Sequence, residues 1–111
     1  MKSKNSDKVV LATTVFSNSL SELRAQLVLR TADEVSVHGY RMVVVDGSPD
    51  ESIGRAISTA GRGSVSVERE KQKGMGSARR QCFRSALEMG AEVVVWIEPE
   101  KYPIVKHLSS C

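Results

Sequence analysis

The feature that most constrains the fold is the regular alternation of short apolar runs with segments of helical periodicity. Four runs rich in β-branched residues occupy positions 9–16, 40–46, 64–70 and 91–97. Between them lie three segments in which apolar residues recur every three or four positions, as on one face of a helix. Alternation at this spacing predicts an α/β domain in which right-handed crossovers place helices on both faces of a parallel sheet.

The character of each apolar run predicts the order of the strands. The run SVSVERE, 64–70, alternates strictly between apolar and polar residues and therefore suits a half-exposed edge strand. The runs VVLATTVF, YRMVVVD and AEVVVWI are continuous and apolar, which is typical of strands buried on both faces. We predict a three-layer α/β/α, Rossmann-like domain with a mainly parallel sheet of order 3-2-1-4.

Capping motifs predict where the helices begin and end. Ser19 with Glu22 and Ser48 with Glu51 fit S-x-x-E capping boxes, Ser77 is placed to cap the third helix, and Gly90 to end it. The residues expected on the buried faces are Leu20, Leu23, Leu27 and Val28 in the first helix, Ile53, Ala56, Ile57 and Ala60 in the second, and Ala78, Cys82, Ala86 and Leu87 in the third.

Length and charge bound the class of protein. The 111 residues correspond to one small domain or part of a larger one, for which we expect a disordered segment at 1–8 and a folded unit at 9–111. The net charge of +3 is too mild to argue for nucleic acid as a partner. No apolar run approaches the roughly 20 residues of a membrane span, and the polar start suggests no secretion signal, so we expect a cytoplasmic location.

Polar residues follow the predicted strands where an open parallel sheet binds its ligands. Such sheets bind outside the carboxyl ends of their strands, near the point where the strand order reverses. In the order 3-2-1-4 this point lies between the first and fourth strands. The residues placed at these ends are Ser17, Asn18, Asp46, Glu98 and Glu100.

Glu98 and Glu100 are candidate metal ligands. They lie two positions apart on an extended segment, with Pro99 between them, so both side chains point to one side. Two convergent carboxylates suit a hard divalent cation, Mg²⁺ or Mn²⁺, whose other ligands would be water and phosphate. The alternative is a solvated strand end in which Lys101 is the partner.

Asp46 has two interpretations. It follows three valines and precedes Gly47, and a carboxylate there can accept hydrogen bonds from a nucleobase or a ribose. An Asp-Gly pair is also a common turn, in which the aspartate only shapes the backbone.

The stretch KGMGSARR, 73–80, is a candidate anion site. Glycines permit close backbone approach, and a helix N-terminus attracts phosphate. Arg79 and Arg80 lie in the first turn of the predicted helix, where cations oppose the helix dipole unless an anion is near. The stretch is no dinucleotide fingerprint, because it lacks the third glycine and follows the third strand rather than the first.

These stretches together resemble the donor-binding half of a family-2 glycosyltransferase of the GT-A fold. VFSN stands at the end of the first strand, with Ser17 at the family's Tyr position and Asn18 retained. VVVDGSPD stands for V-D-D-G-S-x-D with Val45 in place of the first Asp, GMGSAR matches G-x-G-x-A-R, and WIEPE stands for the D-x-D strand end. The resemblance covers the chain from Val9 to about Lys101.

The resemblance implies a nucleoside diphosphate sugar as donor. Ser17, Asn18, Asp46 and Arg79 would bind its nucleotide, while Glu98 and Glu100 would hold a divalent metal beside the diphosphate. In this family the acceptor site and the catalytic base lie beyond the D-x-D strand, where this chain has about ten residues. No catalytic base is therefore assigned, and the chain corresponds to part of a transferase.

Alternative functions remain open beside this one. They are a nucleotide-binding or scaffold module without catalysis, and a nucleotidyltransferase of similar fold. A nucleotidyltransferase and a dinucleotide oxidoreductase both usually carry a glycine-rich loop directly after the first strand, which FSNSLSEL lacks. Because a half-domain exposes apolar surface, we expect the isolated chain to be marginally stable or to self-associate along the fourth strand.

Overall fold

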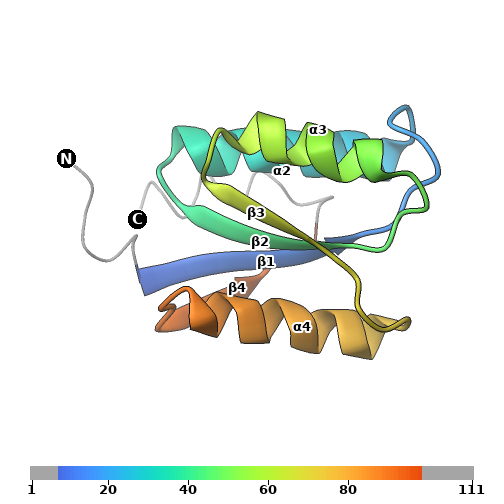
Figure 1. Ribbon diagram of the computed structural model, residues 1–111. Helices are drawn as coiled ribbons and strands as arrows, with labels where there is room; N and C mark the ends of the chain where they lie inside the picture. Colours follow the sequence, from blue (N-terminus) through green and yellow to red (C-terminus); the bar gives the residue numbers. More distant parts are fainter. Residues whose placement is uncertain (1–7, 99–111) are drawn as a thin grey trace.

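The computed structural model describes residues 8–98, which alternate strands with helices throughout (Figure 1). In this part of the chain, no helix has both the length and the apolar character needed to cross a membrane. The elements in chain order are β1 (Val9–Val15), α2 (Leu23–Val37), β2 (Arg41–Asp46), α3 (Glu51–Gly61), β3 (Val65–Arg69), α4 (Met75–Glu88) and β4 (Val93–Trp96).

The four strands form one parallel sheet of order β3-β2-β1-β4, which confirms the predicted topology with β3 at an edge. The register places Val15 opposite Asp46 and Asp46 opposite Arg69, so β1, β2 and β3 end in one row. On the other side of β1, Trp96 pairs with Ala12, and the Ile97 amide donates to the Ala12 carbonyl at 2.9 Å. The carboxyl ends of β1, β2 and β3 are thereby brought together at one end of the sheet.

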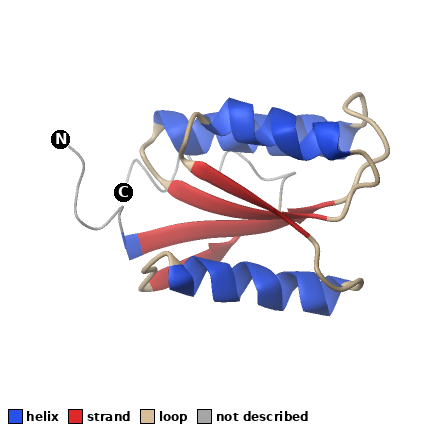
Figure 2. Cartoon of the chain, viewed as in Figure 1, coloured by secondary structure: helices blue, strands red, loops and turns tan. Residues whose placement is uncertain are grey.

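Helices cover both faces of the sheet, as the alternation predicts (Figure 2). Helices α2 and α3 lie on one face and α4 lies on the other, so β1 and β2 bury side chains in both directions. The larger core comprises Leu11, Val15, Val28, Ala32, Val35, Met42, Val44, Ile53, Ile57, Val65 and Ile97. The smaller core, under α4, comprises Val10, Ala12, Val43, Val45, Ala78, Cys82, Ala86 and Ala91.

Three burial predictions are wrong. Leu87 is 63% exposed because α4 packs through Ala78, Cys82 and Ala86, and the next position points away from that row. Leu23, the first residue of α2, is exposed as well. Strand β4 is not buried on both faces: Val93 is exposed and Val94 to Trp96 are half-buried, because β4 forms the second edge of the sheet within residues 8–98.

The predicted capping boxes do not form. Helix α2 begins after Glu22, whose carboxylate accepts from the Asn18 amide at 3.2 Å instead of completing a box with Ser19. Helix α3 begins after Asp50, which accepts from the Ser52 amide at 2.9 Å. This backbone hydrogen bond lowers the pKa of the Asp50 carboxyl.

The third helix also begins elsewhere than predicted. Gly74 is its N-cap residue, with φ 118°, a conformation that favours glycine. Ser77 therefore lies within the first turn, where its hydroxyl accepts from Arg80 at 3.2 Å. The end of α4 is as predicted, because Gly90 adopts φ 90° directly after the C-cap residue Met89.

Cys82 is a core residue, as predicted, and its burial is expected to change how the stability of the protein depends on pH. Its thiol donates to the Thr13 carbonyl at 3.1 Å, and burial raises the pKa of the thiol to about 11 from the ordinary 9.0. Between these values the unfolded chain loses the proton first, so stability falls as the pH rises through this window, by up to about 3 kcal/mol.

The measurement is urea unfolding at pH 8 and pH 10.5, in a Cys111→Ser background that leaves one thiol. The comparison variant is Cys82→Ala, which keeps every other titrating group. We expect a steeper loss of stability with the thiol present, and equal losses in the two proteins would contradict this account.

Candidate functional site

A cleft of about 680 Å³ lies at the carboxyl ends of β1, β2 and β3. Its walls come from the loops that follow these strands, together with the first turns of α2 and α4. Lining residues are Thr14, Val15, Phe16, Arg24, Gly47, Ser48, Pro49, Arg69, Glu70, Lys73, Gly74 and Ala78. The cleft therefore lies at the predicted end of the sheet, but over β1, β2 and β3 rather than between β1 and β4, where the strand order predicts the ligand.

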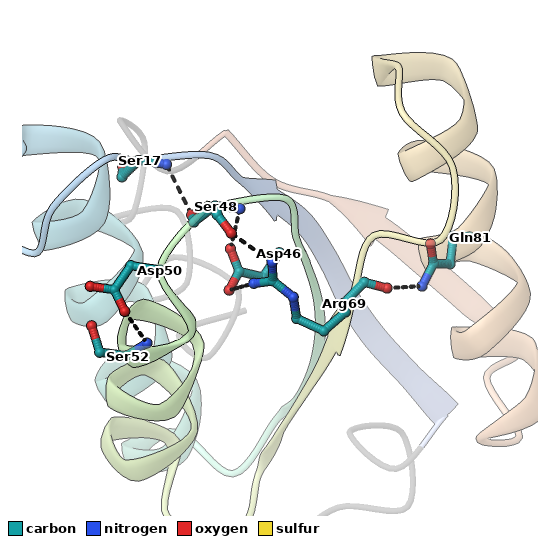
Figure 3. A network of polar contacts seen from close by, with 7 residues as sticks. All are labelled: Ser17, Asp46, Ser48, Asp50, Ser52, Arg69 and Gln81. Atoms are coloured by element: carbon teal, nitrogen blue, oxygen red, sulfur yellow. Dashed lines mark hydrogen bonds and ion pairs between the residues drawn. The ribbon is translucent and has the colours of Figure 1, made fainter.

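Asp46 is the centre of a polar network beneath the cleft (Figure 3). The side chain is fully buried, and both carboxylate oxygens have partners. Oδ1 accepts from the Ser48 amide at 2.8 Å, and Oδ2 forms an ion pair with Arg69 Nη1 at 2.9 Å. The first contact is the turn geometry of an Asp-Gly segment, and the second crosses from β2 to β3.

Arg69 is held at two points. Besides the ion pair with Asp46, its Nη2 donates to the Ser48 carbonyl at 2.6 Å. About half of the Arg69 side chain stays exposed, and it lines the cleft. The guanidinium of Arg69 is therefore held against the turn after β2, while the rest of the side chain is accessible from the cleft.

Gly54 makes room for this network from the α3 side. A Cβ at this position would lie 2.8 Å from Asp46 Oδ2, a distance that real side chains do not tolerate. The absence of a side chain lets α3 pack directly against the buried carboxylate. A larger residue would displace the Asp46 side chain or the helix.

The loops after β1 and β2 are tied to each other. The Ser17 amide donates to Ser48 Oγ at 3.0 Å, and the Gly47 amide donates to the Val15 carbonyl at 2.9 Å. These bonds explain why Ser48 does not cap a helix, since its hydroxyl is engaged by β1's loop. Ser17 is itself buried, while Asn18 is exposed on the same loop.

The cleft combines cations, a carboxylate and an aromatic ring. Arg24, Arg69 and Lys73 supply positive charge, and Glu70 supplies a carboxylate that lies over Gly47, about 3.1 Å from where a Cβ would stand. Phe16 is 60% exposed in the cleft wall. These residue types suit a ligand with phosphate groups, hydroxyls and a flat ring.

Sequence reasoning missed Arg69, Glu70, Arg24 and Phe16. The signal for Arg69 and Glu70 was available, because Arg69 ends the third strand, Glu70 follows it, and carboxyl strand ends share one edge of a parallel sheet. Lys73 and Gly74 belong to the stretch singled out as an anion site, and both line the cleft. Arg24 comes from a helix face, and no local pattern indicates which face reaches the cleft.

Arg79 does not line the cleft. Its guanidinium lies 4.6 Å from the ring centroid of Trp96, a cation–π arrangement at the β4 side of α4. Phe83 packs on the same ring with centroids 6.0 Å apart. The structure thus places Arg79 with β4, apart from Asp46 and Ser17.

Glu98 is exposed just beyond β4, and its Oε2 accepts from Trp96 Nε1 at 2.9 Å. Glu100 and Lys101 lie outside the described residues, so the predicted pairing of the two glutamates stays a prediction. Within residues 8–98 no group of three or more His, Cys, Asp or Glu side chains is placed to hold a metal ion.

The fold and the site together define a Rossmann-like α/β domain with a polar cleft at the carboxyl end of a 3-2-1-4 sheet. Comparisons of the chain with family models, curated proteins and solved structures found no match. The likeness to family-2 glycosyltransferases therefore rests on the sequence motifs alone.

Proposed function

We propose that the cleft binds the nucleoside diphosphate part of a nucleotide sugar, and that the domain is the donor-binding portion of a glycosyltransferase. The observation that carries this proposal is that Arg69 and Lys73 line the same cleft as Gly74, the N-cap residue of α4, at the carboxyl end of a parallel sheet. Cations and helix N-termini favour phosphate for the same electrostatic reason. The sugar and the acceptor are left unassigned.

The other lining residues suit the rest of a nucleotide. The exposed ring of Phe16 offers a stacking surface for a base, a contact worth about 1–3 kcal/mol per base where it has been measured. Glu70 is a hydrogen-bond acceptor for ribose hydroxyls. Among the lining side chains, the cations Arg24, Arg69 and Lys73 outnumber the single carboxylate, Glu70, which suits a diphosphate.

A divalent cation, Mg²⁺ or Mn²⁺, belongs to the same proposal, with Glu98 and Glu100 as its ligands. When bound, such an ion neutralises charge on the departing diphosphate. Glu98 suits this role in being exposed, with one carboxylate oxygen engaged by Trp96. No step of catalysis is assigned to the described residues.

A nucleotide-binding module without catalysis is the second candidate. It uses the same cleft and differs from the first candidate in needing no catalytic base. The engagement of both Asp46 oxygens within the protein removes the base contact that the resemblance gives this residue in either candidate. Release of sugar or nucleoside diphosphate from nucleotide sugars separates the two candidates. Turnover supports the transferase and rejects the module. Binding without turnover agrees with the module and equally with a donor-binding portion that has no acceptor site.

Isothermal titration with UDP, GDP, ADP and CDP tests the proposed site. We expect weak binding of at least one nucleoside diphosphate, and a loss of about tenfold in Lys73→Gln, because a hydrogen bond to a charged group contributes roughly 1.5–3 kcal/mol. The matched control is Lys71→Gln, an exposed lysine of the same loop that does not line the cleft.

Two outcomes would reject the site. One is the absence of binding by all four diphosphates at millimolar concentration. The other is equal weakening by the two lysine substitutions, which would indicate a diffuse charge effect rather than a contact in the cleft.

A further inference from the structure

We infer that Asp46 is a positioning residue that fixes Arg69 in the cleft wall, and that Arg69 binds a phosphate group of the ligand. This inference rests on the proposed nucleotide site and deepens it, because it assigns the phosphate contact to the β3 side of the cleft. It also changes the role of Asp46, which the sequence resemblance assigns to the base.

The first step is that Asp46 has no free oxygen to offer. Its side chain is fully buried, Oδ1 accepts from the Ser48 amide, and Oδ2 accepts from Arg69. On the α3 side, Gly54 and Asp46 both line a smaller hollow of about 210 Å³, and a Cβ at Gly54 would lie 2.8 Å from Oδ2. Because the side chain has no exposed surface and each oxygen has a protein partner, a base would have to displace a partner to bond to this carboxylate.

The second step is the register of the sheet. Asp46 and Arg69 are direct partners in the β2–β3 ladder, at the last position of each strand. The arginine side chain extends from β3 across the end of β2, and its two terminal nitrogens reach Asp46 and the Ser48 carbonyl. Figure 3 shows these residues converging on one another between the ends of the two strands.

The third step concerns the N–H donors of the Arg69 guanidinium that Asp46 and Ser48 do not use. Arginine has five N–H donors, and two are used by Asp46 and Ser48, which among the described residues leaves 5 − 2 = 3. The side chain is half exposed and lines both the cleft and a smaller hollow of about 210 Å³. A planar donor already held in place loses little freedom on binding, and its geometry matches phosphate oxygens.

The fourth step distinguishes the role of Arg69 from that of Lys73. The charge of Arg69 is balanced by Asp46, so it offers directed hydrogen bonds more than net attraction. Lys73, from the β3–α4 loop, lines the same cleft and has no ion-pair partner among residues 8–98, so its charge is available to attract an anion. In this inference both groups bind the diphosphate. Arg69 orients it through directed hydrogen bonds, and Lys73 attracts it through its charge.

The test uses inorganic pyrophosphate beside the nucleoside diphosphate that binds best, because pyrophosphate has no base. If Asp46 positions Arg69, Asp46→Asn weakens both ligands about tenfold, as does Arg69→Gln, and the double variant is no weaker than either. If Asp46 instead contacts the base, Asp46→Asn leaves pyrophosphate binding unchanged, which overturns the inference. Arg55→Gln is the control, an exposed arginine of the smaller hollow only.

A measurement on the unmodified protein removes the dependence on variants that fold poorly. The Arg69 Nε–Hε resonance of the unmodified protein is expected to shift on titration with pyrophosphate. In Asp46→Asn the midpoint of this shift is expected at about tenfold higher pyrophosphate, and a melting curve checks that the variant is folded. An unchanged Arg69 resonance overturns the inference. Failure of the wild-type protein to bind either ligand rejects the proposed nucleotide site itself, so the two failures are distinct.

Discussion

Leu11→Ala is expected to lower the free energy of unfolding by about 3–4 kcal/mol, within the range measured for buried leucine truncations. Leu11 is fully buried in β1, a central strand, and packs in the larger core. The substitution loses the burial of the leucine methyl groups and leaves a cavity that the paired strands cannot close. This loss is a large part of the roughly 5–15 kcal/mol that a domain of this kind has.

Urea unfolding followed by far-UV circular dichroism measures the effect, with Leu87→Ala as the matched control. Leu87→Ala is the same substitution at a position that is 63% exposed, so the free energy of unfolding is expected to change by no more than about 0.5 kcal/mol. Similar costs at the two positions would show that α4 buries Leu87, as the sequence predicts, and that the packing described for α4 is wrong.

Arg69→Met is expected to cost about 2–3 kcal/mol. It leaves the Asp46 carboxylate fully buried with only the Ser48 amide as a partner. Removing one member of a buried ion pair typically costs about 3–5 kcal/mol, and the value is discounted here because half of the Arg69 side chain faces solvent.

The distinguishing measurement is the double variant Arg69→Met with Asp46→Asn. It removes the stranded charge, so it is expected to be at least as stable as Arg69→Met alone. Arg84→Met, at an exposed position of α4, is the control and is expected to change stability by no more than about 0.5 kcal/mol. A double variant that loses the sum of both single effects would mean that Asp46 and Arg69 act independently.

The end of the sheet at which the cleft lies was predictable, but the position of the cleft along the sheet and its residues were predicted only in part. The rule that ligands bind at carboxyl strand ends points to the correct end of the sheet, but the cleft lies over β1, β2 and β3, whereas the prediction put the site between β1 and β4. Lys73 and Gly74 line the cleft and belong to the glycine-rich stretch that was predicted to bind an anion. Arg79 lies instead over Trp96, because the face of α4 that it occupies is turned towards β4. Helical spacing indicates which residues share one face of a helix, but it does not indicate which strand or loop that face packs against.

The capping boxes failed for a related reason. Ser48 has the right neighbours in sequence for an N-cap, yet its hydroxyl accepts from the Ser17 amide of a loop far away in the chain. Asp50, two residues later, caps α3 in its place. The capping motif predicts that the Ser48 hydroxyl accepts a hydrogen bond from an amide in the first turn of the helix. In the structure it accepts instead from the buried Ser17 amide, a tertiary contact that no local motif describes.

The sequence by itself determined the elements and their order. Helical and strand periodicity are local properties, and the contrast between SVSVERE and the continuous apolar runs was enough to place β3 at an edge. Only the tertiary structure decided the chemistry of the cleft. Asp46 and Arg69 are 23 residues apart, and they meet because the parallel register aligns the last residues of β2 and β3. That alignment depends on the packing of the whole sheet against its helices, so no pattern within either segment specifies whether Asp46 faces a ligand or an arginine.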